Sequence, residues 1–150
     1  MRNLFDPERA EEVKARLAGL QPTSTRLWGK MTAPQALAHC CASFQMALGD
    51  TRPPRKLIGR LIGGFIKPLA LGDDAPMRRN SPTVDAMIIS GERDLAVERA
   101  RLVGFIDRFV AGGAAGCTVH PHPFFGPLTP EQWAILMYKH TDHHLRQFGA

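Results

Sequence analysis

The chain has 150 residues, of which 44% are hydrophobic and 22% charged, a balance typical of a globular protein with one domain over residues 1–150. No apolar run approaches the roughly 20 residues needed to cross a bilayer, and the charged amino terminus lacks a secretory signal, so we expect a cytoplasmic protein with no membrane partner. The net charge of +5 does not indicate nucleic acid, because the basic residues are mostly spread along the chain and only 7% of residues are aromatic.

Helix signals dominate the first third of the chain. Asp6, followed by a proline and an acidic residue, predicts the start of a helix, and Gly19 predicts its end. After a connector over residues 20–27, Thr32 and Gln35 have the spacing of a capping box. They predict a second helix that runs to about residue 48.

The middle of the chain, residues 51–94, is predicted to be irregular. Loop-like stretches flank the apolar LIGRLIGGFIKPLAL, which we expect to form a short helix and a lid. An alternative is binding to a membrane surface, because Arg60 and Lys67 interrupt the apolar residues. Two adjacent glycines and Pro68 weigh against a helix there, and therefore against this alternative.

Two further helices are predicted in the last third. The segment 94–110 carries apolar residues at spacings of three and four, and Thr129 with Gln132 repeats the capping-box pattern before a last helix that ends near residue 148. No stretch alternates apolar and polar residues as a strand would. The four helices predict an all-α fold, namely a four-helix bundle with an irregular middle segment.

Histidines provide the strongest indication of chemistry. His140 and His144 are four residues apart, so both rings of a helical pair can point to one side, and they lie in an apolar stripe that we expect to be buried. His39, in the second helix, is a candidate third partner. Its direction stays open, because that helix is apolar almost all round and His39 could face either a cleft or a polar edge.

Three imidazoles with a fourth position left to water are the arrangement of a catalytic zinc site. The alternative is that these histidines are partly buried, hydrogen-bonded side chains. Cys40 and Cys41 are interpreted as small core residues rather than nucleophiles, and three cysteines without a CxxC motif suit a reducing compartment.

His39 in a capped helix and the carboxyl-terminal segment HPFFGPLTPEQWAILMYKHTDHHLRQFG resemble the DinB-like (YfiT-like) superfamily of metal-binding four-helix bundles, and in particular one uncharacterised bacterial branch of it. The resemblance implies a three-histidine site for zinc or nickel, formed by His39, His140 and His144. It also implies a bacterial cytoplasmic homodimer and thiol-dependent transferase or isomerase chemistry with low-molecular-weight thiols.

Other residues are candidates for the surroundings of such a site. His143 could replace His144 as a ligand or support it. Tyr138 could donate a hydrogen bond in the cleft, although packing with an exposed hydroxyl is the favoured role. His122 is interpreted as part of a structural plug over the last helix, bordering the cleft, whereas Asp142 points away from the histidine pair. The arginines expected to bind an anionic substrate are Arg52, Arg55 and Arg79.

Two functions follow as hypotheses. The first is a metal-dependent, thiol-dependent transferase or a hydrolase that acts on a small anionic substrate. The second is a non-catalytic bundle, with structural histidines, that acts through dimerisation or in a stress response. An enzyme needs an open coordination position, whereas a structural site is closed by a fourth protein ligand.

Overall fold

The computed structural model describes residues 1–81, 83 and 85–150, and this part of the chain is helical without any strand. The all-α class predicted from the sequence is therefore confirmed. The α-helices are α1 (Pro7–Gly19), α2 (Ala33–Ala47), α3 (Leu57–Leu71), α4 (Leu95–Gly112) and α5 (Pro130–Gln147), and two short 3-10 helices are η1 (Asp85–Met87) and η2 (Gly113–Gly116).

The starts of α1, α2, α4 and α5 lie where the sequence predicts them, and each has a capping side chain. The Asp6 side chain accepts a hydrogen bond from the backbone at the start of α1, and Asp94 does the same for α4. Thr32 and Thr129 each form a complete capping box with the glutamine three residues later, at α2 and α5. These side chains satisfy backbone N–H groups that a helix start leaves without partners.

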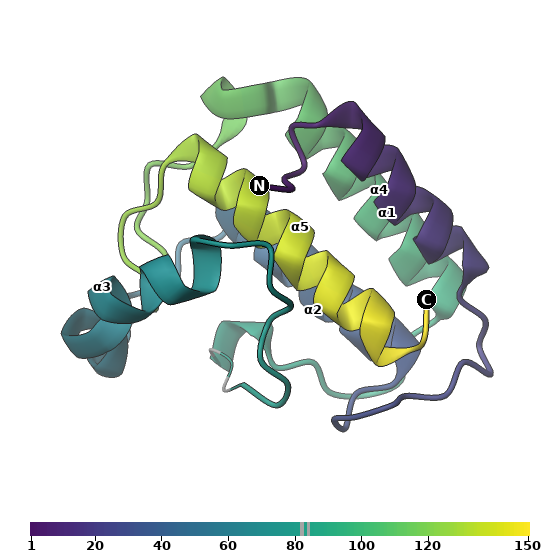
Figure 1. Cartoon of the computed structure of the whole chain (residues 1–150). Coiled ribbons are helices and arrows are strands. Elements are labelled where there is room, and N and C mark those ends of the chain that lie inside the picture. Colours follow the sequence, from purple (N-terminus) through teal and green to yellow (C-terminus); the bar gives the residue numbers. More distant parts are fainter. Residues whose placement is uncertain (82, 84) are drawn as a thin grey trace.

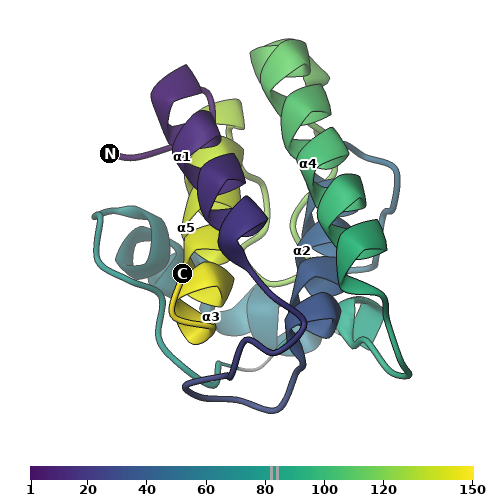
Figure 2. The ribbon, with the colours of Figure 1, turned by 90° about the vertical axis from the view of Figure 1, so that its right-hand side faces the viewer.

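Helices α1, α2, α4 and α5 surround a common core (Figures 1 and 2). Helix α2 contacts α4 and α5, and α1 contacts the same two helices from the other side. Phe44, Phe109 and Trp133 are among the largest fully buried side chains of this core. Helix α5 is buried on nearly every side, so the predicted buried stripe that carries His140 and His144 is confirmed.

Helix α3 lies at the edge of the molecule (Figure 1), and its length corrects the prediction of a short helix. It runs unbroken over 15 residues, with Pro68 inside it. A Cβ atom on Gly63 would lie 2.0 Å from the Phe124 carbonyl oxygen, and one on Gly59 would lie 2.6 Å from the Phe124 Cα. These two glycines allow α3 to contact the loop closely, and this tertiary contact outweighs their low helix propensity.

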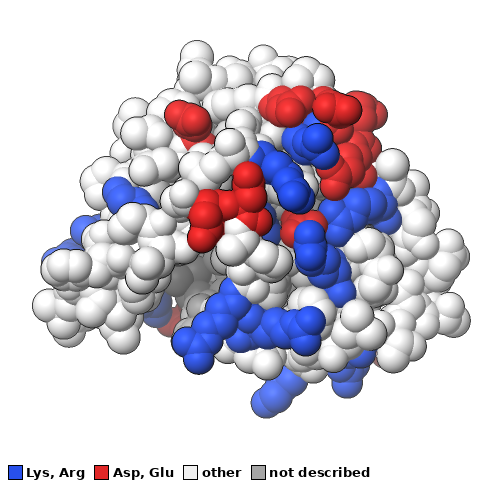
Figure 3. Space-filling view, viewed as in Figure 1, with Lys and Arg blue, Asp and Glu red and all other residues white. Residues whose placement is uncertain are grey.

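The segment after α3 packs back over the carboxyl-terminal helix. The Lys139 ammonium on α5 donates a hydrogen bond to the Asp73 carbonyl oxygen at 3.0 Å. Lysine, arginine and acidic side chains intermingle over the face that α1 and α5 present in Figure 3. None of the helices in the described residues is long and apolar enough to cross a membrane.

Candidate metal centre

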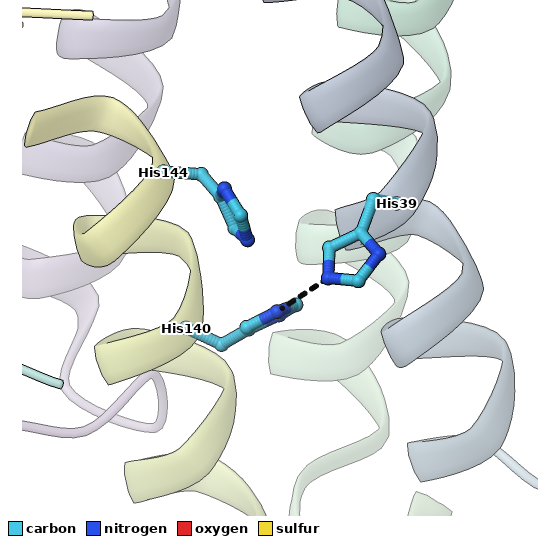
Figure 4. Close-up of side chains that lie close together, drawn as sticks. All are labelled: His39, His140 and His144. Atoms are coloured by element: carbon cyan, nitrogen blue, oxygen red, sulfur yellow. Dashed lines mark hydrogen bonds between the residues drawn. The ribbon is translucent and has the colours of Figure 1, made fainter. Parts of the chain in front are cut away.

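Three histidines from two helices meet inside the molecule (Figure 4). His39 comes from α2, and His140 and His144 come from α5. One nitrogen from each ring can be chosen so that all three lie within 4.8 Å of one another, and the Nε2 atoms of His39 and His140 are 3.0 Å apart. The structure answers the question that periodicity left open, because His39 faces the histidine pair.

Hydrogen bonds from the outer nitrogens orient two of these rings. His39 Nδ1 lies 2.7 Å from the Met87 carbonyl oxygen, and His144 Nδ1 lies 2.8 Å from Gln147 Oε1. Since a carbonyl oxygen only accepts, each Nδ1 must carry the proton and donate. Each Nε2 is then left with its lone pair, and the amide of Gln147 is itself fixed by a 2.8 Å hydrogen bond to the Trp28 carbonyl oxygen.

Burial keeps the three imidazoles neutral near pH 7. His39, His140 and His144 are only 5%, 9% and 6% exposed. Removal from water disfavours the imidazolium, which lowers the pKa of His39, lowers that of His140 far below its usual range and lowers that of His144 to about 3. A neutral imidazole is the form that binds metal.

The donor set fits one divalent ion of the zinc type. A tetrahedral ion with Zn–N distances of 2.0–2.1 Å holds its nitrogens about 3.4 Å apart. The Nε2 atoms of His39 and His140 are 3.0 Å apart, and all three ring nitrogens lie within 4.8 Å of one another. In the part of the chain that the structure describes, no cysteine or carboxylate joins the group. The described residues thus offer three candidate ligands, one fewer than a tetrahedral ion takes.

His143, the alternate ligand considered from the sequence, lies beside the group rather than in it. Its ring packs edge-on against His144, with centroids 5.1 Å apart, and lies 5.5 Å from the Trp28 ring. The Arg79 guanidinium lies over Trp28, 4.1 Å from its ring centre. Arg79, Trp28 and His143 therefore form a continuous row of contacts that ends at His144.

Tyr138 and Asp142 lie on other sides of α5. The Tyr138 hydroxyl is 3.4 Å from Glu12 on α1, which contradicts its placement in a cleft with the histidines. Two positions along a helix correspond to about 200°, so Tyr138 and His140 point in nearly opposite directions. Asp142 pairs with Arg16 and Arg146, each at 2.8 Å, which agrees with its predicted direction away from the histidine pair.

His122 lies in the turn formed by residues 122–126 and packs against α5. Its Nδ1 accepts hydrogen bonds from the backbone N–H groups of Phe124 and Phe125, and its ring packs on Trp133 of α5. Burial, together with the nearby charge of Arg55, lowers the pKa of His122 to about 4.

The three arginines proposed for anion binding lie in different surroundings. Arg55 donates to the Gly59 carbonyl oxygen at 2.9 Å and lies against Gly126, so its guanidinium is engaged beside the turn formed by residues 122–126. Arg52 is exposed. Arg79 is the one of the three that lies over Trp28, whose ring in turn packs against His143 beside the histidine group.

Cys40 and Cys41 are fully buried, so their predicted place in the core is confirmed. Burial raises the pKa of both thiols, that of Cys41 to about 12. Neither is therefore a thiolate near neutral pH.

Three residues around the histidines were not among those predicted from the sequence. Met87 contributes only its backbone carbonyl group, which carries no signal in the side chain. Trp28 lies in the connector between α1 and α2, more than 100 residues before His143. Gln147 could have been found, because it follows His144 by three residues on the same helix and so lies within reach of its ring.

The fold and this geometry define a helical protein with a buried three-histidine group. Residues 4–150 match the family described as "Protein of unknown function (DUF1569)", so the chain belongs to that family. Neither the curated proteins nor the solved structures gave a match.

Proposed function

We propose that this chain is a four-helix bundle of the DinB-like (YfiT-like) type that binds one zinc or nickel ion through Nε2 of His39, His140 and His144. We further propose that it uses the ion as a metal-dependent transferase or hydrolase on a small anionic substrate, with a low-molecular-weight thiol as the candidate co-substrate.

One observation is the main support for the proposed metal site. Three buried imidazoles converge from two helices, and the outer nitrogens of His39 and His144 are held by the Met87 carbonyl oxygen and by Gln147. Such outer hydrogen bonds are typical of metal-binding histidines, since they fix the tautomer and the ring orientation. If His39 and His144 served only as core residues, their inner nitrogens would not need to face a common point.

We favour an enzyme because the protein supplies three ligands, which leaves a position on a bound ion for water or substrate. A divalent ion held by three imidazoles supplies a Lewis acid that lowers the pKa of a bound water or thiol. The chain itself contributes rings that are fixed before binding and a nearly dry environment, in which charge interactions are stronger than in water. Arg79 is the candidate for holding an anionic substrate, because its guanidinium lies on Trp28 beside His143.

The first test is the metal content of protein purified without an affinity tag or chelator, measured by plasma mass spectrometry. We expect near-stoichiometric zinc or nickel in the wild type and its loss in His39→Ala and His144→Ala. His120→Ala is the matched control, because His120 is half-buried and bonds the Pro53 carbonyl oxygen instead. A wild-type protein that stays free of metal after reloading would refute the proposal.

The alternative is a non-catalytic protein whose histidines have a structural role. The low exposure of the group, 5% to 9%, also suits that function. If the protein is an enzyme, turnover of thiol-transfer substrates should require the metal and should weaken in Arg79→Ala while the metal content is kept. Metal binding without any such turnover would favour the structural alternative.

A further inference from the structure

Helix α3 presents an apolar face that the rest of the molecule leaves uncovered. Six large side chains on it are between 38% and 79% exposed, namely Leu57, Ile58, Leu61, Ile62, Phe65 and Leu69. Their spacing places them on one side of the helix, and Gly59 and Gly63 lie on the other side, against the Phe124 backbone. A concentrated apolar surface of this kind marks an interaction site.

The segment that carries this face has charged side chains of one sign only. Between residues 51 and 72 the chain has no acidic residue and five basic ones, Arg52, Arg55, Lys56, Arg60 and Lys67. Arg52 and Arg60 are exposed, whereas Lys67 and Arg55 bond backbone carbonyl groups and Lys56 pairs with Asp85. The two acids that follow are themselves engaged, Asp73 with Lys139 and Asp74 with the backbone N–H of Arg2.

We propose that α3 is an interfacial anchor that binds an anionic lipid surface. A helix that lies in the plane of a membrane buries an apolar face among the acyl chains and places basic side chains among the headgroups. The apolar face of α3 and its positively charged border match these two requirements.

The same features favour a membrane over a second copy of the chain. Two α3 helices packed face to face would bring equal positive charges together, with no acidic residue in either segment to pair with them. The objection that the sequence raised, a helix weakened by Gly63, Gly64 and Pro68, is removed because α3 is continuous over Leu57–Leu71. The inference therefore replaces the expectation of no membrane partner, and it does not depend on the metal site.

The test is flotation of the full chain with vesicles at low salt, comparing phosphatidylcholine alone with equal parts of phosphatidylcholine and phosphatidylglycerol. We expect the wild type to float with the anionic vesicles and to lose most of that binding at high salt. The double variant Leu61→Asp/Phe65→Asp should bind at least roughly tenfold more weakly. Arg60→Glu should weaken binding by roughly 30-fold, because it removes one positive charge and adds a negative one, and each charge near an anionic surface contributes about 1 kcal/mol.

Val119→Asp is the matched control, because Val119 is 99% exposed but lies outside α3; its binding should equal that of the wild type. Circular dichroism shows whether each variant keeps its helices. A wild type that does not float, or a double variant that floats equally well, would overturn the proposal. So would a wild-type dimer that becomes monomeric in the double variant without any binding to vesicles, because α3 would then be covered by a second copy.

Discussion

Gln147 determines the orientation of His144 through a single hydrogen bond of 2.8 Å. If the ring is a metal ligand, Gln147→Leu should weaken metal affinity by roughly 10- to 100-fold, because the ring loses the partner that fixes its tautomer. Competition with a chromogenic chelator measures this affinity directly.

Gln147→Glu is the matched variant, because a carboxylate still accepts a hydrogen bond from His144 Nδ1. We expect it to keep metal affinity close to that of the wild type, although it loses the amide donor to the Trp28 carbonyl oxygen. Equal affinity in Gln147→Leu and the wild type would show that the ring needs no such support.

His122 should make the fold sensitive to acid. Its pKa is lowered from 6.5 to about 4 in the folded protein, so the unfolded chain takes up a proton first as the pH falls. The free energy of unfolding should be unaffected by this group above pH 6.5 and should fall progressively between pH 6.5 and 4, by on the order of 3 kcal/mol in total.

Urea unfolding in the presence of a chelator measures this effect without a contribution from metal. In His122→Gln the slope of stability against pH should be smaller over the same range, because glutamine does not titrate and its oxygen can still accept from the loop. An unchanged slope would assign the acid sensitivity to the other buried histidines.

At the scale of elements, the attachment of α3 to the 122–126 turn depends on which glycine faces it. Gly63→Ala should destabilise the docked helix by on the order of 1–3 kcal/mol, because its Cβ would lie 2.0 Å from the Phe124 carbonyl oxygen. Gly64 has no atom within 4 Å of such a Cβ. Gly64→Ala should instead stabilise α3 by about 0.5–1 kcal/mol through its higher helix propensity.

Hydrogen exchange read by mass spectrometry over residues 57–71 distinguishes these outcomes. Protection of α3 should decrease in Gly63→Ala and increase in Gly64→Ala, while α5 stays unchanged in both. Equal effects of the two substitutions would mean that the close contact with Phe124 does not hold α3 in place.

The contrast between α3 and the other helices also shows where sequence patterns suffice. The starts of α1, α2, α4 and α5 depend on side chains within three residues, such as Thr32 with Gln35, and they were predicted correctly. The length of α3 was not, because Gly59 and Gly63 owe their place to a loop more than 60 residues further along the chain. Propensity describes a segment in isolation and cannot include such a contact.

For the whole molecule, removal of metal should leave the fold intact. The hydrophobic core around Phe44, Phe109 and Trp133 packs through apolar contacts that need no metal, so far-UV circular dichroism should be unchanged after treatment with a chelator. Tm should fall only because the free energy of metal binding no longer stabilises the folded state. That contribution is about 4 kcal/mol when the free metal is a thousandfold above Kd.

His144→Ala provides the control, because its Tm should not respond to added metal. Loss of helix content on chelation would instead identify a structural site, since such metals contribute folding energy directly. That result would favour the non-catalytic alternative over the enzyme.

The sequence by itself determined the helical class, four of the helix starts and the buried stripe of α5 with His140 and His144, because capping and periodicity are local properties of the chain. The tertiary structure decided which way His39 points, that His143 stands beside the group and that Tyr138 faces Glu12. It also decided that Met87 and Gln147 hold the rings and that the face of α3 stays uncovered. Each of these depends on distances between segments far apart in the chain, which only the packing of the helices fixes.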